Sequence, residues 1–130
     1  MKTILYIEDN ADNLKVLRLM INRLRPADEV IPSDTAERGL ELANELQPDL
    51  ILMDINLPRM NGYQALEILQ NNVATSHIPV VAVTAYAMQE NIRQGMAAGF
   101  AAYITKPVNM QELNHTLEML LPVSNMAHIG

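Results

Sequence analysis

The fold is decided by Leu50-Ile51-Leu52-Met53-Asp54, a run of four apolar residues that ends in a carboxylate. Two further short runs, Ile4 to Ile7 and Val80 to Val83, are equally apolar. An unbroken aliphatic run of this length is typical of a strand that is buried on both faces, as the central strands of parallel sheets are. The three runs therefore predict three central strands of a parallel sheet.

Two weaker strand candidates and a series of helices complete the pattern. Glu29 to Ser33 contains Pro32, which suits an edge strand because proline cannot donate to a sheet ladder, and Ala101 to Ile104 follows Gly99, which ends a helical segment. Elsewhere apolar residues recur at helical spacing. They form four stripes: Leu14, Leu17, Met20, Ile21 and Leu24; Ala36, Leu40, Ala43 and Leu46; Ala65, Leu66 and Leu69; and Met110, Leu113, Leu117 and Leu120. Strand and helix alternate five times, which predicts an α/β fold, a three-layer αβα sandwich with a parallel sheet.

Length and composition indicate a single domain. The chain has 130 residues, 49% of them hydrophobic, which suffices for one core of ordinary size. No linker or repeat interrupts the alternation, and the nine residues after Leu121 are too few for a second domain. We expect residues 1–122 to form the domain and residues 123–130 to form a C-terminal tail.

The charge and cysteine content exclude several classes of function. With 15 acidic and 9 basic side chains, the formal net charge is −6, which argues against direct DNA binding. The absence of cysteine excludes disulfides, thiolate catalysis and cysteine-ligated metals. No apolar run approaches the roughly 18 residues of a membrane span, and the run before Glu8 is too short for a signal-peptide core. We therefore expect a cytoplasmic protein with no membrane partner.

Polar residues follow every predicted strand. In an open parallel sheet the ligand site lies beyond the carboxyl ends of the strands, so these residues are the candidate site. They are Glu8 and Asp9, Ser33 and Asp34, Asp54, Thr84, and Thr105, Lys106 and Pro107. Each has an ordinary alternative, since Glu8 and Asp9 could cap a helix with Asn10 and Asp54 could be a solvated carboxylate. The joint placement of Glu8 and Asp9, Asp54, Thr84 and Lys106 at four of these strand ends favours a common function.

The residue types at these strand ends suit phosphoryl transfer. Three neighbouring carboxylates repel one another unless a cation neutralises them, and Mg²⁺ is suited to carboxylate oxygens. The ammonium of Lys106 and the hydroxyl of Thr84 suit phosphoryl oxygens. Asp54, at the end of a central strand, could then act as a nucleophile and become an acyl phosphate.

From Thr3 to Leu121 the sequence resembles the receiver domain of two-component response regulators. The motifs that carry the resemblance are Tyr6-Ile7-Glu8-Asp9-Asn10, Pro48-Asp49-Leu50-Ile51-Leu52-Met53-Asp54-Ile55-Asn56-Leu57-Pro58, Met60-Asn61-Gly62, Pro79-Val80-Val81-Ala82-Val83-Thr84-Ala85 and Ala101-Ala102-Tyr103-Ile104-Thr105-Lys106-Pro107. The resemblance implies a flavodoxin-like (βα)5 fold with strand order 2-1-3-4-5. It also implies either a single-domain, chemotaxis-regulator-like protein or the receiver of a hybrid histidine kinase.

The resemblance assigns a role to each site residue. Asp54 would accept a phosphoryl group from a phosphohistidine on a sensor histidine kinase or a histidine phosphotransfer protein. Mg²⁺, with Mn²⁺ as a possible substitute, would be bound directly by Asp9 and Asp54, through water by Glu8, and by the main-chain carbonyl of Asn56. Lys106, preceding Pro107 in a cis peptide bond, would pair with the phosphoryl group. Thr84 and the aromatic Tyr103 would then move and change the face made by the fourth helix, fifth strand and fifth helix, to which a downstream effector protein binds.

Three other functions compete with this phosphorylation switch. A dehalogenase-type hydrolase with multiple turnovers would need an acid/base Asp where Asn56 stands, and a flavodoxin would need a phosphate-binding loop where Glu8-Asp9-Asn10 would repel phosphate. A receiver-like module that only docks and is never phosphorylated would not need the acidic set with Thr84 and Lys106. We therefore expect a regulatory domain that catalyses its own phosphorylation and dephosphorylation.

Overall fold

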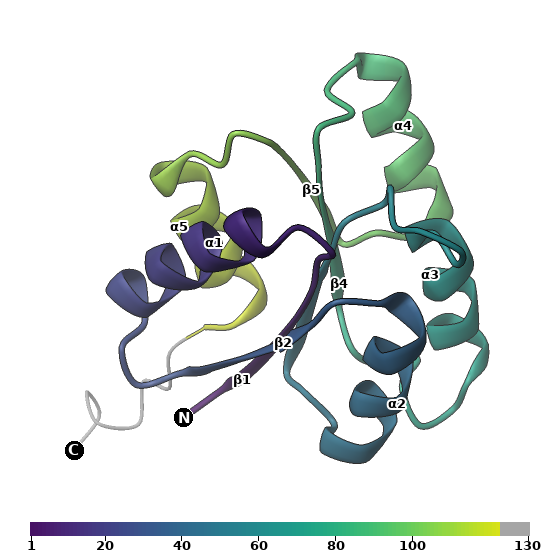
Figure 1. The fold of residues 1–130 in the computed structure, drawn as a ribbon, viewed down its shortest axis with the longest axis horizontal. Coiled ribbons are helices and arrows are strands. Elements are labelled where there is room, and N and C mark those ends of the chain that lie inside the picture. The colour runs from purple at the N-terminus through teal and green to yellow at the C-terminus, as the bar shows by residue number, and fades with distance from the viewer. Residues whose placement is uncertain (123–130) are drawn as a thin grey trace.

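Five strands and five helices alternate along the described part of the chain in the computed structural model (Figure 1). The structure describes residues 1–122; the C-terminal tail expected at residues 123–130 lies outside the described residues. The elements are β1 (Thr3–Ile7), α1 (Ala11–Leu24), β2 (Glu29–Ser33), α2 (Ala36–Leu46), β3 (Leu50–Met53), α3 (Gly62–Asn71), β4 (Val80–Thr84), α4 (Gln89–Ala98), β5 (Ala102–Thr105) and α5 (Met110–Leu120).

The strands form one parallel sheet in the order β2-β1-β3-β4-β5. This order confirms the predicted fold class and strand order, and it places β3, with Asp54 after it, in the centre of the sheet. Pro32 pairs with Tyr6 in the edge strand β2, where its missing N–H faces away from the ladder. The fifth strand runs from Ala102 to Thr105, so it begins and ends one residue later than expected.

Two hydrophobic cores cover the two faces of the sheet. Alternate residues of β3 belong to opposite cores: Ile51 and Met53 pack with α2 and α3, whereas Leu50 and Leu52 pack with α1 and α5. Helices α1 and α5 lie on one side of the sheet and α2, α3 and α4 on the other (Figure 1). Both faces of the central strands are therefore buried, which is why their sequences are apolar throughout instead of alternating.

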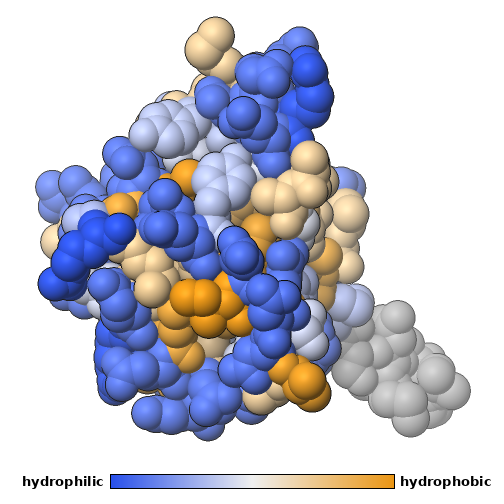
Figure 2. Space-filling model, turned by 90° about the vertical axis from the view of Figure 1, so that its right-hand side faces the viewer, coloured by the Kyte–Doolittle hydropathy of each residue, from blue (hydrophilic) through white to orange (hydrophobic). Residues whose placement is uncertain are grey.

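The helices present polar residues to solvent. Figure 2 shows the side of the molecule that carries α2, α3 and α4, where the surface is mostly hydrophilic with small hydrophobic areas between. Among the described residues, none of the helices combines the length and the apolar character that a bilayer crossing requires.

Candidate functional site

Main-chain hydrogen bonds bring the ends of the strands together at one edge of the sheet. The N–H of Glu8 donates to the Ser33 carbonyl at 2.9 Å, that of Asp54 to the Ile7 carbonyl at 3.1 Å, and that of Lys106 to the Thr84 carbonyl at 2.8 Å. Because each residue that follows a strand is tied to the neighbouring strand, side chains from distant parts of the sequence share one small region.

Three carboxylates meet in this region. Oxygen atoms of Glu8, Asp9 and Asp54 all lie within 4.8 Å of one another. Glu8 and Asp54 are buried, with 1% and 7% of their surface exposed, whereas Asp9 is exposed to solvent. The cluster is thus open on one side and held by buried groups on the other.

Lys106 reaches two of these carboxylates. Its ammonium donates to Glu8 Oε1 at 2.5 Å and to Asp54 Oδ2 at 3.0 Å. Burial lowers the pKa of Lys106, but the hydrogen bonds and charges of the two carboxylates outweigh burial and raise the pKa above its ordinary value. The amine therefore stays protonated, and three carboxylates with one ammonium carry a formal charge of −2.

Glu8 accepts hydrogen bonds on both carboxylate oxygens. The Tyr6 hydroxyl and Lys106 donate to Oε1, the former at 3.0 Å, and the Asn10 N–H donates to Oε2 at 3.2 Å. Burial raises the pKa of Glu8 and the charge of Asp54 adds to this, although Lys106 and the Asn10 N–H oppose it. Burial and the nearby Glu8 also raise the pKa of Tyr6, so this phenol remains a neutral donor.

Tyr6 is a site residue that the sequence analysis missed. It stands in an apolar strand, and its ring is fully buried in the core beside α1 and α5. Two signals point to its contact: a buried tyrosine hydroxyl needs a partner, and residues two apart on a strand share a face. Glu8 stands two residues after Tyr6.

Helix α1 is capped by Asn10, and not by Glu8 or Asp9, for which capping was the alternative explanation. The Asn10 side chain accepts from the Asn13 N–H at 2.9 Å and caps α1. Glu8 and Asp9 take part in the carboxylate cluster. At the end of β2, the Ser33 hydroxyl donates to the Thr35 carbonyl, and Asp34 does not belong to the cluster found among residues 1–122.

Asp54 is held at two oxygens from the end of β3. Its Oδ1 accepts from the Asn56 N–H at 3.1 Å, and its Oδ2 accepts from Lys106. The Lys106–Pro107 peptide bond is cis. Gly62, at the start of α3, packs closely against the main chain of Asp54 and Ile55. A Cβ at residue 62 would lie 2.7 Å from Ile55 Cα and 2.8 Å from the Asp54 carbonyl oxygen.

Thr84 and Tyr103 are connected through the loop after β4. Thr84 is buried, and its hydroxyl accepts from the Tyr86 N–H at 3.4 Å. The Tyr103 hydroxyl donates to the Tyr86 carbonyl at 2.8 Å. Burial, followed by the neighbouring Tyr63 and Asp54, raises the pKa of Tyr103, so the hydroxyl keeps its proton for this bond.

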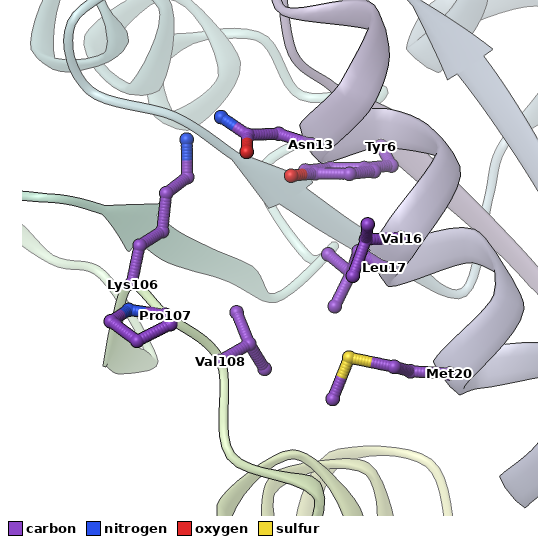
Figure 3. Close-up of a pocket in the computed structure, with 8 residues that line it drawn as sticks. All are labelled: Tyr6, Asn13, Val16, Leu17, Met20, Lys106, Pro107 and Val108. Atoms are coloured by element: carbon purple, nitrogen blue, oxygen red, sulfur yellow. The ribbon is translucent and has the colours of Figure 1, made fainter.

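A cavity of about 150 Å³ lies beside Lys106, between α1 and the segment after β5 (Figure 3). Leu17, Met20 and Val108 form an apolar part of its wall, and the polar ends of Asn13, Tyr6 and Lys106 lie near one another on another side of it. This cavity adjoins the carboxylate cluster without containing it. It gives the site an apolar flank next to its charged centre.

The donor set fits a hard divalent cation. Mg²⁺ binds a few carboxylate oxygens and keeps several waters, and the cluster supplies carboxylates with a net charge that a divalent ion would cancel. The exposed position of Asp9 leaves room for waters on the open side. The described site contains no sulfur or imidazole donor that would favour a softer metal.

Comparisons with known proteins agree with this geometry. Residues 4–118 match the model of the response regulator receiver domain family. The polar-differentiation response regulator DivK of Brucella ovis is 40% identical over 123 residues, which cover 92% of this chain and 96% of that protein. DivK of Brucella anthropi is equally similar, with 40% identity over 123 residues.

Solved structures are similar over almost the whole chain. The receiver domain of a sensor histidine kinase from Pseudomonas aeruginosa, which has a magnesium ion coordinated in its active-site cleft, is 29% identical with a TM-score of 0.84 and covers 94% of this chain and 98% of that one. The signal receiver domain of a DNA-binding response regulator from Colwellia psychrerythraea has a TM-score of 0.87 at 24% identity, covers 95% of this chain and 100% of that one, and supports the fold.

Proposed function

Because the chain belongs to the response regulator receiver domain family of two-component signalling, we propose that Asp54 is the residue that accepts the phosphoryl group. One observation carries this proposal. The Asp54 carboxylate lies at the end of the central strand, within 4.8 Å of oxygens of Glu8 and Asp9, and accepts a 3.0 Å hydrogen bond from Lys106. It is the carboxylate that the other charged groups of the site surround.

The reaction is an exchange of one bond to phosphorus for another. An oxygen of the Asp54 carboxylate attacks phosphorus, the bond between phosphorus and the histidine nitrogen of the donor breaks, and the nitrogen leaves with the electron pair. Water attack on phosphorus later restores the carboxylate and releases phosphate. The domain thus catalyses its own phosphorylation and dephosphorylation and is not a multiple-turnover enzyme.

The residues of the site would hold a cation and the transferred group. Glu8, Asp9, Asp54 and the main-chain carbonyl of Asn56 would bind Mg²⁺, or Mn²⁺ in its place. When bound, the cation supplies positive charge that offsets the carboxylates and the phosphoryl oxygens. Once the Asp54 oxygen is bonded to phosphorus, Asp54 is no longer a charged carboxylate, and Lys106 would pair with a negatively charged phosphoryl oxygen instead.

Thr84 and Tyr103 would transmit the phosphorylated state. A phosphoryl group adds roughly −1.5 to −2 charge and several acceptor oxygens, which attract the Thr84 hydroxyl. The Tyr86 main chain contacts the Thr84 hydroxyl on one side and the Tyr103 hydroxyl on the other, so movement of Thr84 affects Tyr103. The change reaches the face formed by α4, β5 and α5.

The partners belong to the same proposal. A sensor histidine kinase or histidine phosphotransfer protein supplies the phosphoryl group, and a downstream effector protein reads the α4–β5–α5 face, without direct DNA binding. We also propose a cytoplasmic location. We further propose that residues 1–122 form the receiver domain and that residues 123–130 form a tail.

Intact mass after incubation with acetyl phosphate and Mg²⁺ tests the acceptor. We expect a gain of one phosphoryl group in the wild type and in Asp34→Asn, a control that removes an exposed strand-end carboxylate outside the cluster. Asp54→Asn should abolish the gain. An unchanged wild-type mass, or a gain that persists in Asp54→Asn, would refute the proposal.

A further inference from the structure

Helix α4 is seated on the sheet in an unusual way. Within α4, all of which the structure describes, Gly95 is the one buried residue. The other helices each bury two or more residues. Gly95 is therefore the residue through which α4 approaches the sheet most closely, beside the half-buried Asn91 and Ile92.

Gly95 touches the ring of Tyr103. A Cβ at residue 95 would lie 2.6 Å from Tyr103 Cδ2 and 2.7 Å from Cε2, distances that side chains do not tolerate. The same Cβ would lie 3.7 Å from Phe100 Cδ2, an ordinary contact, so the conflict is with Tyr103. The Tyr103 ring therefore occupies the space that a side chain at residue 95 would need.

The backbone gives no other reason for a glycine here. Gly95 is helical and is not among the positive-φ glycines, in contrast to Gly99, which caps α4 at φ 114°. A glycine inside a helix costs roughly 0.5–1 kcal/mol relative to alanine, a cost that alanine would remove if space allowed. The steric contact with Tyr103 accounts for the glycine.

The far end of the same ring is also tied to α4. The Tyr103 hydroxyl donates to the carbonyl of Tyr86, two residues before the Met88 N-cap of the helix. The ring thus lies against the last turns of α4 through Gly95 and is bonded to the loop that leads into its first turn. If the Tyr103 ring moves, either its contact with Gly95 or its hydrogen bond to Tyr86 must break, or α4 must move together with the ring.

We infer that Gly95 is a positioning residue for Tyr103, and that their contact couples the position of the ring to the position of α4. This rests on the proposed function, because the coupling matters only if Tyr103 responds to the state of Asp54. It identifies the contact by which such a response changes the α4 part of the partner-binding face.

A double-mutant cycle on the unphosphorylated protein tests the coupling. Gly95→Ala in the wild type should lower the equilibrium constant for folding, because the ring or the helix must shift. In a Tyr103→Val background, which removes the ring and suits a strand, Gly95→Ala should raise that constant roughly two- to fivefold, the helix-propensity gain of alanine. Equal effects of Gly95→Ala in the two backgrounds, measured by urea unfolding, would overturn the inference.

The response to a phosphoryl mimic separates positioning from simple packing. Amide NMR spectra are recorded with Mg²⁺ before and after addition of beryllium fluoride. In the wild type we expect signals near Asp54 and along α4 to shift, whereas in Gly95→Ala those near Asp54 should shift as before and those of α4 should shift less. Ala97→Gly is the control, since it changes helix propensity at an exposed position of α4 away from the ring.

The outcomes distinguish this inference from the proposed function. Full α4 shifts in Gly95→Ala would overturn the inference while leaving Asp54 as the acceptor. A wild-type spectrum that does not respond near Asp54 would contradict the proposed function and remove the basis of the positioning role, so the inference would fall with it.

Discussion

Lys106 is the one positively charged side chain that is paired with the carboxylate cluster in the described structure. Its ammonium lies on Glu8 and Asp54, and it brings the formal charge of the cluster from −3 to −2. Its positive charge therefore reduces the attraction of the cluster for a cation, and on the proposed function it would pair with the phosphoryl oxygens after transfer. On that proposal, the same group would oppose metal binding and assist the reaction.

Lys106→Met separates these two effects. Removing one positive charge a few ångströms from the carboxylates should raise Mg²⁺ affinity roughly five- to thirtyfold, the effect of about 1–2 kcal/mol of Coulomb energy in a partly solvated site. Phosphorylation by acetyl phosphate should nevertheless slow at saturating Mg²⁺. Calorimetric titration and intact mass measure the two quantities, with Lys15→Met, at an exposed position of helix α1, as the control. A weaker Mg²⁺ affinity would contradict this account.

Tyr6 supports Glu8 from inside the core. Tyr6→Phe keeps the ring and removes the 3.0 Å hydrogen bond to Glu8 Oε1. A buried acceptor loses a donor, so we expect unfolding free energy to fall by about 1–3 kcal/mol in urea unfolding. The effect should be smaller in a Glu8→Gln background, because the amide makes a weaker bond than the carboxylate does. The same loss in both backgrounds would show that the bond to the Glu8 carboxylate is not its cause.

Lys106 and Tyr6 also show which site residues can be predicted from sequence patterns and which cannot. Asp54, Thr84 and Lys106 could be named because Thr84 ends a strand and the other two directly follow one, and a parallel sheet brings strand ends to one edge. The Lys106–Glu8 contact joins residues 98 positions apart and required the strand order as well. Tyr6 was missed because an aromatic residue inside an apolar strand is ordinarily only core.

At the scale of elements, the pattern of apolar residues in each strand or helix reflects which of its faces are buried. The strands β1, β3 and β4 are apolar runs because helices cover both of their faces. Helix α4 shows no apolar stripe, and the structure explains why: its one buried residue is Gly95, which packs on a ring instead of burying a side chain of its own. A helix seated by a glycine cannot be found from hydrophobic periodicity.

The turn between α1 and β2 depends on one buried ion pair. Asp28 accepts from the Lys2 N–H at 2.9 Å and from Arg25 Nε at 2.5 Å, and both side chains of the pair are 8% exposed. Burial raises the pKa of Asp28, but the Lys2 N–H and the Arg25 guanidinium outweigh it and hold the pKa below the ordinary 3.8. The pair thus ties the end of α1 to the start of β1.

Asp28→Asn should therefore destabilise the fold in a pH-dependent way. A lowered carboxyl pKa contributes stability that is present above the ordinary value and is lost as pH falls through the folded value. We expect a loss of about 1–3 kcal/mol at neutral pH that shrinks below about pH 4, measured by urea unfolding across that range. Asp34→Asn, at an exposed position, is the control. A loss that is constant with pH would show that charge is not involved.

At the scale of the whole molecule, the carboxylate cluster links cation binding to folding. Three carboxylates drawn within 4.8 Å exist only when β1 and β3 are paired, so the unfolded chain has no equivalent site. A ligand that binds only the folded state stabilises it by mass action, by about 2.7 kcal/mol at one hundred times its dissociation constant. The acidic site is thus a cost to the fold without a cation and a source of stability with one.

Asp9→Asn distinguishes these two contributions, because Asp9 is exposed and its removal leaves the core intact. Without divalent cations the variant should be as stable as the wild type or slightly more stable, since one repelling charge is gone. Adding Mg²⁺ should raise the melting temperature of the wild type and of Asp34→Asn, with a much smaller rise in Asp9→Asn. Calorimetry across a Mg²⁺ series measures both effects. An undiminished rise in Asp9→Asn would mean that the cation binds elsewhere on the molecule, and the carboxylate cluster would then owe its stability to Lys106 alone.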